Sequence, residues 1–191
     1  MRNSPLLTIT SMSVGYKTEK DPYICLGEFD NETKIKQISV INLYDNKVQN
    51  VLYKKDLKAL NWKITFATIL KNSSNCVSLS KKESNLNITN ISFWKFTQEQ
   101  FISEAFIEED IRHCACNPKN TYEIVLCGKN YLRLWNVFIN QGIIREHPQR
   151  FLKSKQEKEF TFLNIEFFEK KSFMFCVSTL ENTVFIIEGF I

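Results

Sequence analysis

Residues 131–137 read YLRLWNV, a short run that alternates apolar and polar positions and ends in Trp135-Asn136. Alternation with period two predicts a half-buried β-strand. Trp followed by Asn at the end of such a strand also resembles the Trp-Asp pair of a repeated β unit, with Asn in place of Asp. The rest of the chain decides between a repeat unit and a lone buried tryptophan.

Similar strand-like runs fill the sequence, with Asn, Lys, Asp and Ser between them as turn residues. The runs group in fours, and the third run of each group aligns as ISVINL, ISFWKF, LRLWNV and VFIIEG. This alignment places Ile41, Trp94, Trp135 and Ile187 in one column, at spacings of 53, 41 and 52 residues. Such spacings lie at or somewhat above the usual length of a four-stranded propeller blade.

We therefore predict an all-β chain made of WD40-like β-propeller blades. The approximate units are residues 8–54, 62–107, 111–147 and 160–191. A β-sandwich or barrel is the alternative, because these folds also give short alternating strands at similar spacing. The last unit supplies three strands, so we expect an incomplete propeller whose open end exposes apolar surface and favours self-association or a protein partner.

Composition excludes several classes of function. Hydrophobic residues make up 43% and charged residues 24%, which is typical of a globular protein. The formal charge of +4 comes from basic and acidic residues scattered along the chain, which does not indicate nucleic-acid binding. No apolar run has the length of a membrane span, and the N-terminal residues lack a signal-peptide pattern. We expect no membrane association and a cytoplasmic location.

The residues that could carry metal or catalytic chemistry are few. His113 lies next to Cys114 and Cys116, but a single residue between the two cysteines does not fit the Cys-x₂₋₄-Cys spacing of zinc sites. We expect no metal and no cofactor, and all six cysteines as reduced core residues. The other histidine, His147, precedes Pro148 and is predicted to lie in a loop. No catalytic motif accompanies either histidine, so we predict that the chain is not an enzyme.

The last candidates for a functional site are runs of charged residues. The acids at 108–110 are expected in a turn between units. The lysines within 151–160 and the pairs at 54–55 and 81–82 are interleaved with or flanked by acids. Basic stripes with stacking aromatics, as in single-strand binders, are not evident, so these segments are expected to be solvated.

Four segments together resemble a known family. They are ITSMSV at 9–14, ISVINLYDNKVQNVL at 38–52, SNLNITNISFWKF at 84–96 and CNPKNTYEIVLCGKNYLRLWNV at 116–137. In this order they are similar to blades of the WD-repeat cilia- and flagella-associated proteins, over most of residues 8–138. The resemblance implies a non-catalytic protein–protein interaction scaffold in the ciliary or flagellar axoneme, with partners associated with inner dynein arms. A cytosolic WD-repeat scaffold unrelated to cilia, in vesicle traffic or RNA–protein assembly, is the alternative.

The chain also departs from that family pattern. The Asp of Trp-Asp is replaced by Asn42, Lys95, Asn136 and Glu188 in the four units. The hydrogen-bonded His–Ser–Trp–Asp cluster that braces regular blades therefore cannot form. We expect apolar packing to hold these blades instead.

Overall fold

The chain folds as a series of antiparallel β-sheets. The computed structural model describes residues 7–18, 20–30, 36–45, 47–52, 62–71, 73–82, 84–151, 159–168, 170–171 and 173–189. Within these ranges, fifteen strands form three four-stranded sheets and one three-stranded sheet, and two short 3₁₀ turns are the helical segments. The prediction of an all-β chain is confirmed. The sheets belong to two compact units, Met1–Phe106 and Ile107–Ile191.

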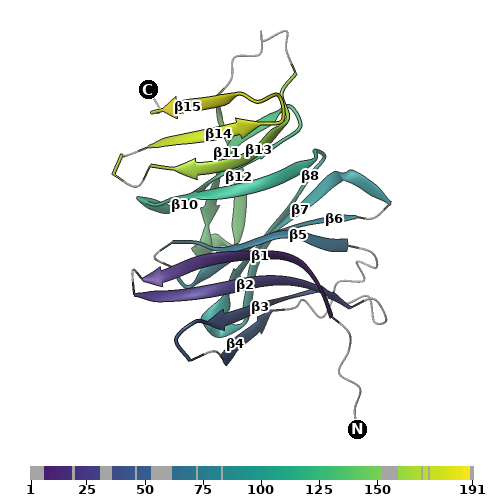
Figure 1. The fold of residues 1–191 in the computed structure, drawn as a ribbon, viewed down its shortest axis with the longest axis vertical. Helices are drawn as coiled ribbons and strands as arrows, with labels where there is room; N and C mark the ends of the chain where they lie inside the picture. Colours follow the sequence, from purple (N-terminus) through teal and green to yellow (C-terminus); the bar gives the residue numbers. More distant parts are fainter. Residues whose placement is uncertain are drawn as a thin grey trace. The chain divides into compact units, whose positions relative to one another are not determined.

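The N-terminal unit holds two sheets, and in each the strands lie side by side in chain order (Figure 1). The first sheet consists of β1 (Leu7–Thr18), β2 (Asp21–Asp30), β3 (Lys36–Asn42) and β4 (Lys47–Leu52). The second consists of β5 (Trp62–Ile69), β6 (Asn75–Lys82), β7 (Asn85–Lys95) and β8 (Gln100–Ile107), with the turn η1 (Phe96–Gln98) between β7 and β8.

The C-terminal unit repeats this arrangement with one strand fewer among its described residues. Its first sheet consists of β9 (Ile111–Asn117), β10 (Asn120–Gly128), β11 (Tyr131–Phe138) and β12 (Ile143–Arg150), with the turn η2 (Ile139–Gln141) between β11 and β12. Its second sheet consists of β13 (Phe162–Phe167), β14 (Met174–Thr179) and β15 (Val184–Glu188).

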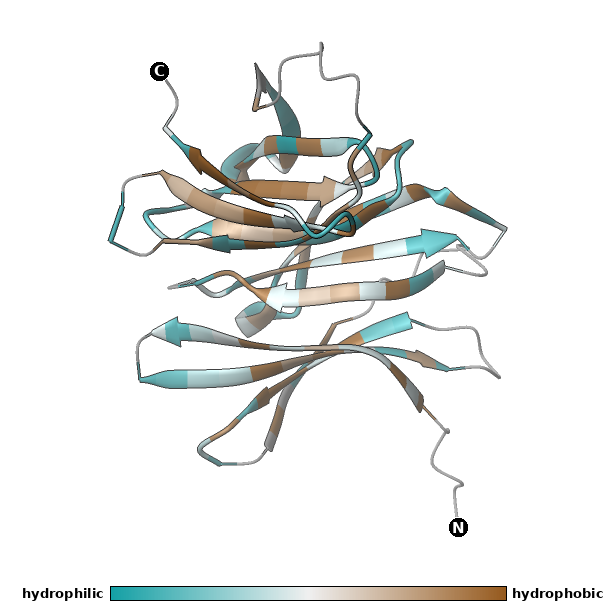
Figure 2. Cartoon of the chain, turned by 45° about the horizontal axis from the view of Figure 1, so that its top comes forward, coloured by the Kyte–Doolittle hydropathy of each residue, from teal (hydrophilic) through white to brown (hydrophobic). Residues whose placement is uncertain are grey.

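Side-chain alternation along each strand explains which faces are buried. In β14, Phe175 and Val177 are buried while Met174 and Cys176 on the other face are half-buried. Hydrophobic and hydrophilic residues alternate along many strands in this way (Figure 2). β6, an inner strand of its sheet, instead buries six consecutive residues, so side chains on both of its faces are buried.

The two sheets of the N-terminal unit stack with β1 and β2 against β5. A Cβ on Gly15 would lie 2.7 Å from the Cβ of Ile69, and a Cβ on Gly27 would lie 2.6 Å from the Cγ2 of Ile64. Real Cβ atoms do not approach so closely, so glycine at both positions lets the strands come together.

Buried apolar side chains fill the space between these two sheets. Hydrogen bonds also join the two sheets: the Ser13 hydroxyl donates to the carbonyl oxygen of Ala67 at 2.6 Å, and the Lys36 ammonium donates to the Ser80 hydroxyl at 2.9 Å. The core consists of Tyr23, Cys25, Ile38, Val40, Leu52, Ile64, Ala67, Ile69, Cys76, Trp94 and Phe96.

Phenylalanine rings dominate the core of the C-terminal unit, where β13 packs against β9. The ring centroids of Phe167 and Phe175 lie 5.2 Å apart, and those of Phe173 and Phe175 lie 5.8 Å apart. Tilted and edge-to-face pairs at these distances add to the stability gained by burying the rings. The core consists of Val125, Cys127, Leu132, Leu134, Phe162, Ile165, Phe167, Phe173, Phe175 and Val177.

One segment differs from the prediction. His147 does not lie in a loop, because β12 continues through Pro148 to Arg150, past the predicted end of the third unit at residue 147. Since β12 is the outer strand of its sheet, it tolerates a proline that lacks a backbone N–H.

Substitution of Gly15 by Val tests the close approach of β1 to β5. We expect the free energy of unfolding to fall by about 1–3 kcal/mol, because the new side chain would collide with Ile69. Urea titration followed by circular dichroism measures this. Val14→Ala, on the exposed face of the same strand, is the control. An equal or larger loss in the control would contradict the packing.

Candidate interaction surface

The four residues aligned in the sequence all lie on the third strand of a sheet. Ile41 is on β3, Trp94 on β7, Trp135 on β11 and Ile187 on β15. Each is paired with a residue of the second strand: Ile24, Cys76, Ile124 and Phe175, respectively. The two tryptophans are buried, whereas the two isoleucines are half-buried.

Trp94 combines apolar packing with a polar contact. Its ring belongs to the core between the first two sheets and meets the ring of Phe101 edge-on, with centroids 5.2 Å apart. Its indole N–H donates to the Ser78 hydroxyl at 3.2 Å. Ser78 lies on β6, beside the strand that carries Trp94.

Trp135 finds a different polar partner. Its indole N–H donates to the Tyr131 hydroxyl at 2.9 Å, which lies 3.3 Å from the Glu146 carboxylate. The Arg133 guanidinium pairs with the same carboxylate at 3.2 Å and lies over the Tyr131 ring. Burial, and then the Glu146 charge, raise the pKa of the Tyr131 hydroxyl well above its usual value, so it stays protonated and donates to the carboxylate.

These contacts correct one expectation. Apolar packing alone does not hold the blades, because both buried indoles donate hydrogen bonds to hydroxyl groups: Trp94 to a serine, as in the Ser–Trp pair of the regular cluster, and Trp135 to a tyrosine. Asn136, at the Asp position, lies half-buried opposite Glu123 of β10 and Arg145 of β12. Asn42, at the same position of the first sheet, accepts a hydrogen bond from the Tyr44 backbone N–H at 2.8 Å.

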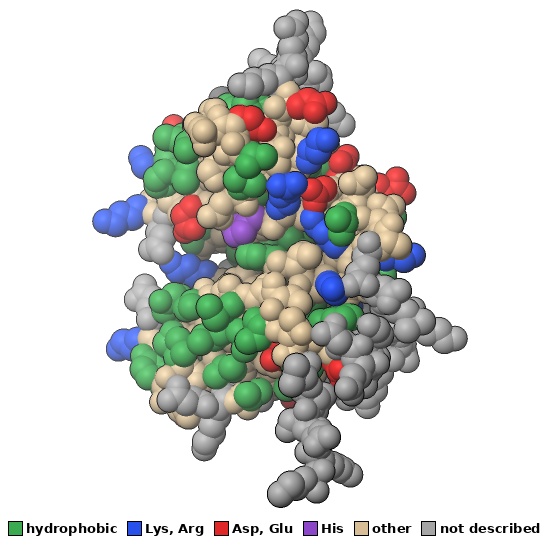
Figure 3. Space-filling view, turned by 45° about the vertical axis from the view of Figure 1, so that its right-hand side comes forward, with side chains coloured by type: hydrophobic (Ala, Val, Ile, Leu, Met, Phe, Trp, Pro, Cys, Tyr) green, Lys and Arg blue, Asp and Glu red, His purple; other side chains and the backbone are tan. Residues whose placement is uncertain are grey.

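An apolar strip runs along β1 on the face of the first sheet that points away from β5. Met12, Val14 and Tyr16 are 69%, 53% and 43% exposed, and they alternate with Ser13 and Gly15, which face β5. Strand pairing adds further apolar residues to this outer face, namely Ile24, Leu26, Ile41 and Val48. Figure 3 shows hydrophobic side chains gathered in the part of the molecule that holds the first sheet.

The polar groups at the border of this outer face are satisfied within the sheet. The buried Glu28 carboxylate accepts hydrogen bonds from the Ser39 hydroxyl and from the Gln37 side-chain amide. A partner covering the apolar strip would therefore not leave this carboxylate without partners. Large exposed apolar surfaces of this kind mark interaction sites more often than single exposed residues do.

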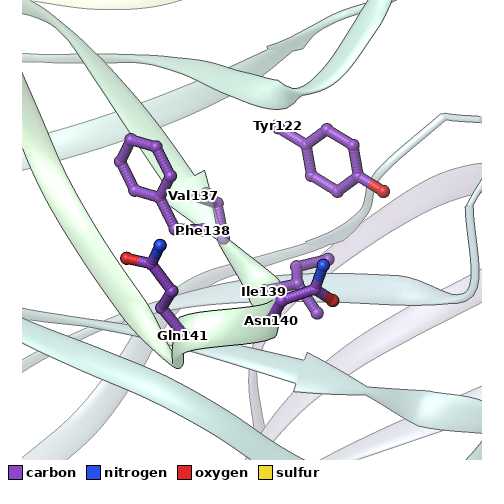
Figure 4. Close-up of a pocket in the computed structure, with 6 residues that line it drawn as sticks. All are labelled: Tyr122, Val137, Phe138, Ile139, Asn140 and Gln141. Carbon is purple, nitrogen blue, oxygen red and sulfur yellow. The ribbon is translucent and has the colours of Figure 1, made fainter.

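A surface pocket of about 280 Å³ lies at the end of β11 in the C-terminal unit (Figure 4). Tyr122 of β10 and Phe138 of β11 are 52% and 44% exposed. Figure 4 shows their two rings apart, with the side-chain amides of Asn140 and Gln141 below them. The lining residues are Tyr122, Val137, Phe138, Ile139, Asn140 and Gln141.

Sequence reasoning missed this pocket, although its signals are in the sequence. The left-handed residue that ends the turn after the third strand comes five residues after Trp94, at Glu99, but seven residues after Trp135, at Gly142. The two turns have the same length, so the difference is two further residues at the end of β11, Val137 and Phe138, which line the pocket together with the turn. Tyr122 lies in an irregular stretch of β10 pairing, between Asn120 and Ile124, where its strand bulges.

The cysteines and histidine of β9 and β10 do not form a reactive site. Cys114 and Cys116 share one face of β9, while His113 lies opposite Cys127 on the other face. Burial raises the pKa of Cys116 and of Cys127 to about 12 and raises that of Cys114 well above its usual value, so these thiols stay protonated. Among the described residues, no group of three His, Cys, Asp or Glu is placed to hold a metal ion.

The charged runs named in the sequence analysis do not gather into one site. Glu108 and Glu109 lie in the bend before β9, and Lys81 and Lys82 end β6. Lys54 and Lys55 lie outside the described residues, and so do residues 152–158, which contain the lysines of the segment 151–160. Across the described part of the chain, no helix is long and apolar enough to cross a membrane.

Comparison with known proteins supports the fold. No family model matches the chain, and no curated protein sequence matches it. Among solved structures, the β-propeller domain of Cps50 (Swd1) from Myceliophteria thermophila is similar over 95% of the chain, with 13% identity and a TM-score of 0.65. Hydrazine synthase from Kuenenia stuttgartiensis is similar over 91%, with 10% identity and a TM-score of 0.59. Sqt1 from Saccharomyces cerevisiae is similar over 94%, with 8% identity and a TM-score of 0.54.

These similarities establish blades of the WD40-like β-propeller type and favour them over a sandwich or barrel. The chain spans 52%, 63% and 59% of the length of the three solved chains. One of the three is named as a synthase, so the fold by itself does not decide whether a chain is catalytic.

Substitution of Trp135 by Ala tests the bracing of the third sheet. We expect a loss of about 3–5 kcal/mol in the free energy of unfolding, because the change removes a large buried ring and the donor to Tyr131. Phe168→Ala, at an exposed position of the same unit, is the control and should cost about 0.5 kcal/mol or less. Chemical denaturation measures both, and equal losses would contradict the bracing role.

The half-buried His113 predicts a dependence of stability on pH. Burial lowers its pKa to about 4 from 6.5, because the charged imidazole would lose its hydration. The unfolded chain therefore binds a proton at a higher pH than the folded chain does. The stability from this group is fully present above pH 6.5 and is lost as the pH falls toward 4.

The measurement compares the wild-type chain with His113→Leu. Between pH 7 and pH 4, we expect the wild type to lose on the order of 3 kcal/mol more than the variant, from the cited shift in pKa. Urea titrations at several pH values give the difference, in which carboxylates common to both chains cancel. Parallel pH profiles of the two chains would contradict the assignment.

Proposed function

We propose that this chain is a non-catalytic protein–protein interaction scaffold of the WD-repeat type. The observation that carries the proposal is the apolar strip of Met12, Val14 and Tyr16 on the outer face of the first sheet. Its backbone is held by close packing of β1 on β5, so the strip is a rigid surface. A rigid apolar surface loses little entropy when a partner covers it.

The chemistry of the strip favours a protein over other ligands. The residues on this outer face are mainly aliphatic, with Tyr16 as an aromatic member, and the Glu28 carboxylate at its border is already hydrogen-bonded. Protein interfaces have apolar centres depleted of charge, whereas nucleic-acid interfaces need positive charge to meet the phosphates. The four-stranded sheet also presents a broad surface rather than a pocket of ligand size.

The absence of catalysis is part of the same proposal. Its support is that the half-buried His113 has a lowered pKa, and that the thiols around it have raised pKa values. Such groups resist the charged forms that acid–base and nucleophilic steps require. The pocket at the end of β11 is lined by residues that carry no titratable group other than the Tyr122 phenol.

The finer proposal assigns the scaffold to the ciliary or flagellar axoneme, with protein partners associated with inner dynein arms. Its support is the resemblance of residues 8–138 to axonemal WD-repeat proteins, carried by the segments quoted above. Met12 and Val14 of the exposed strip lie within the first of those segments, ITSMSV, so the resemblance and the candidate surface share one strand.

The experiment compares partner capture by the wild-type chain and by the double variant Met12→Glu, Val14→Glu. Both chains are immobilised and incubated with axonemal extract and, separately, with a cytosolic extract, and the bound proteins are quantified by mass spectrometry. Two buried charges should reduce capture of strip-dependent proteins by more than tenfold. Leu180→Glu, at an exposed apolar position of the C-terminal unit, is the control.

The outcomes separate the parts of the proposal. Loss of specific partners in the double variant alone supports the scaffold, and recovery of inner dynein arm proteins from the axonemal extract supports the axonemal assignment. Equal capture by all three chains would contradict the strip as the binding surface. Light scattering tests for self-association: a dimer that the double variant dissociates would identify a second copy as the occupant of the strip.

A further inference from the structure

We propose that the pocket at the end of β11 binds a proline-containing segment of a partner protein, held in an extended polyproline conformation. The inference rests on the proposed function, because it names a ligand class for a second surface of the same scaffold. It involves Tyr122, Phe138, Asn140 and Gln141, which lie in the C-terminal unit and share no residue with the strip on β1.

The size and walls of the pocket fit a side chain rather than a cofactor. Its volume of about 280 Å³ is just below the range of small-molecule sites, which begins at roughly 300 Å³. The exposed rings of Tyr122 and Phe138, with Val137 and Ile139, give apolar walls. None of the lining residues is charged, so a charged side chain would lose hydration there without gaining an ion pair.

The polar groups of the pocket match a ligand that accepts hydrogen bonds but has few N–H groups to donate. The side-chain amides of Asn140 and Gln141 each carry an NH₂ donor, and neither has a hydrogen-bond partner among the described residues. A polyproline segment presents solvated carbonyl oxygens and lacks backbone N–H groups at its prolines. Aromatic-lined grooves recognise such segments in other proteins, because the ligand loses little conformational entropy on binding.

Both sides of the pocket are fixed before any ligand arrives. On one side, the Tyr122 backbone N–H donates to Asn120 at 3.2 Å, and the Glu123 carboxylate accepts from Asn120 at 2.9 Å and from Asn117 at 2.7 Å. These bonds hold the bulge of β10. On the other side, the N–H of Gly142, in a left-handed conformation, donates to the Ile139 carbonyl oxygen and closes the turn.

The turn also distinguishes this sheet from the second sheet of the N-terminal unit. The corresponding turn has the same length, but β7 ends one residue after Trp94 whereas β11 ends three residues after Trp135, and the turn after Trp94 ends at a charged residue, Glu99. The buried Phe96 opens η1, whereas the exposed Phe138 directly precedes η2. The pocket is therefore a feature of one blade rather than a general property of the repeat.

The test measures binding of an acetylated and amidated decaproline peptide to the full chain by isothermal titration calorimetry. A Gly-Ser decapeptide and an Ala-Leu decapeptide with the same capped ends serve as comparison ligands. We expect decaproline to bind, and Tyr122→Ala and Phe138→Ala each to weaken it about tenfold, as removal of an aromatic contact does. Tyr44→Ala, an exposed aromatic of the N-terminal unit, should leave the affinity unchanged.

A further variant tests the donors. Asn140→Asp keeps the shape of the side chain but replaces its NH₂ by a carboxylate oxygen, so it should weaken decaproline binding at pH 7 by several-fold. Circular dichroism checks that each variant remains folded. No binding of decaproline at millimolar concentration, equal binding of the Gly-Ser or Ala-Leu peptide, or unchanged affinity in both aromatic variants would overturn the proposal. Partner capture through the β1 strip would be unaffected by that result, so the two proposals fail separately.

Discussion

Two sheets stack closely only where their backbones can approach, and in the N-terminal unit this approach depends on Gly15 and Gly27, which have no side chains. Once β1 lies against β5, the alternation of side chains along the strand fixes which of its residues face the core and which face outward. Ser13 points inward and reaches a carbonyl of β5, while Met12 and Val14 must point outward. The candidate interaction surface is therefore a geometric result of the same contact that forms the core. A change that separates the two sheets would disturb both.

Each buried tryptophan has a polar partner, but the partner differs between sheets. Trp94 donates to a serine on the neighbouring strand, and Trp135 donates to a tyrosine four residues earlier on its own strand. Burying an indole without a partner is unfavourable, so each sheet needs some acceptor. The sequence does not need to keep one fixed set of residues for this purpose. This freedom explains how the third strands keep their geometry without the Asp of the Trp-Asp pair.

Sequence periodicity was sufficient to predict the all-β fold and to align Trp94 with Trp135, because a large side chain recurs at one position of the third strand along the sequence. The pocket could not be predicted in the same way. It depends on a bulge at Tyr122 and on two further residues at the end of β11, and neither feature recurs with a period along the sequence. His147 was placed in a loop because the following proline argues against a strand. That argument holds for a central strand, but β12 lies at an edge.

Pro148 in this edge strand has a consequence for how the protein behaves at high concentration. An outer strand exposes unpaired backbone groups, and a second chain can add to them and begin an aggregate. At Pro148 the ring replaces the N–H that an incoming strand would need, and the irregular pairing between Arg133 and Trp135 interrupts the regular ladder beside it. The edge of this sheet is thereby a poor template for uncontrolled growth. At this edge, association with other chains is left to side-chain contacts, where it can be selective.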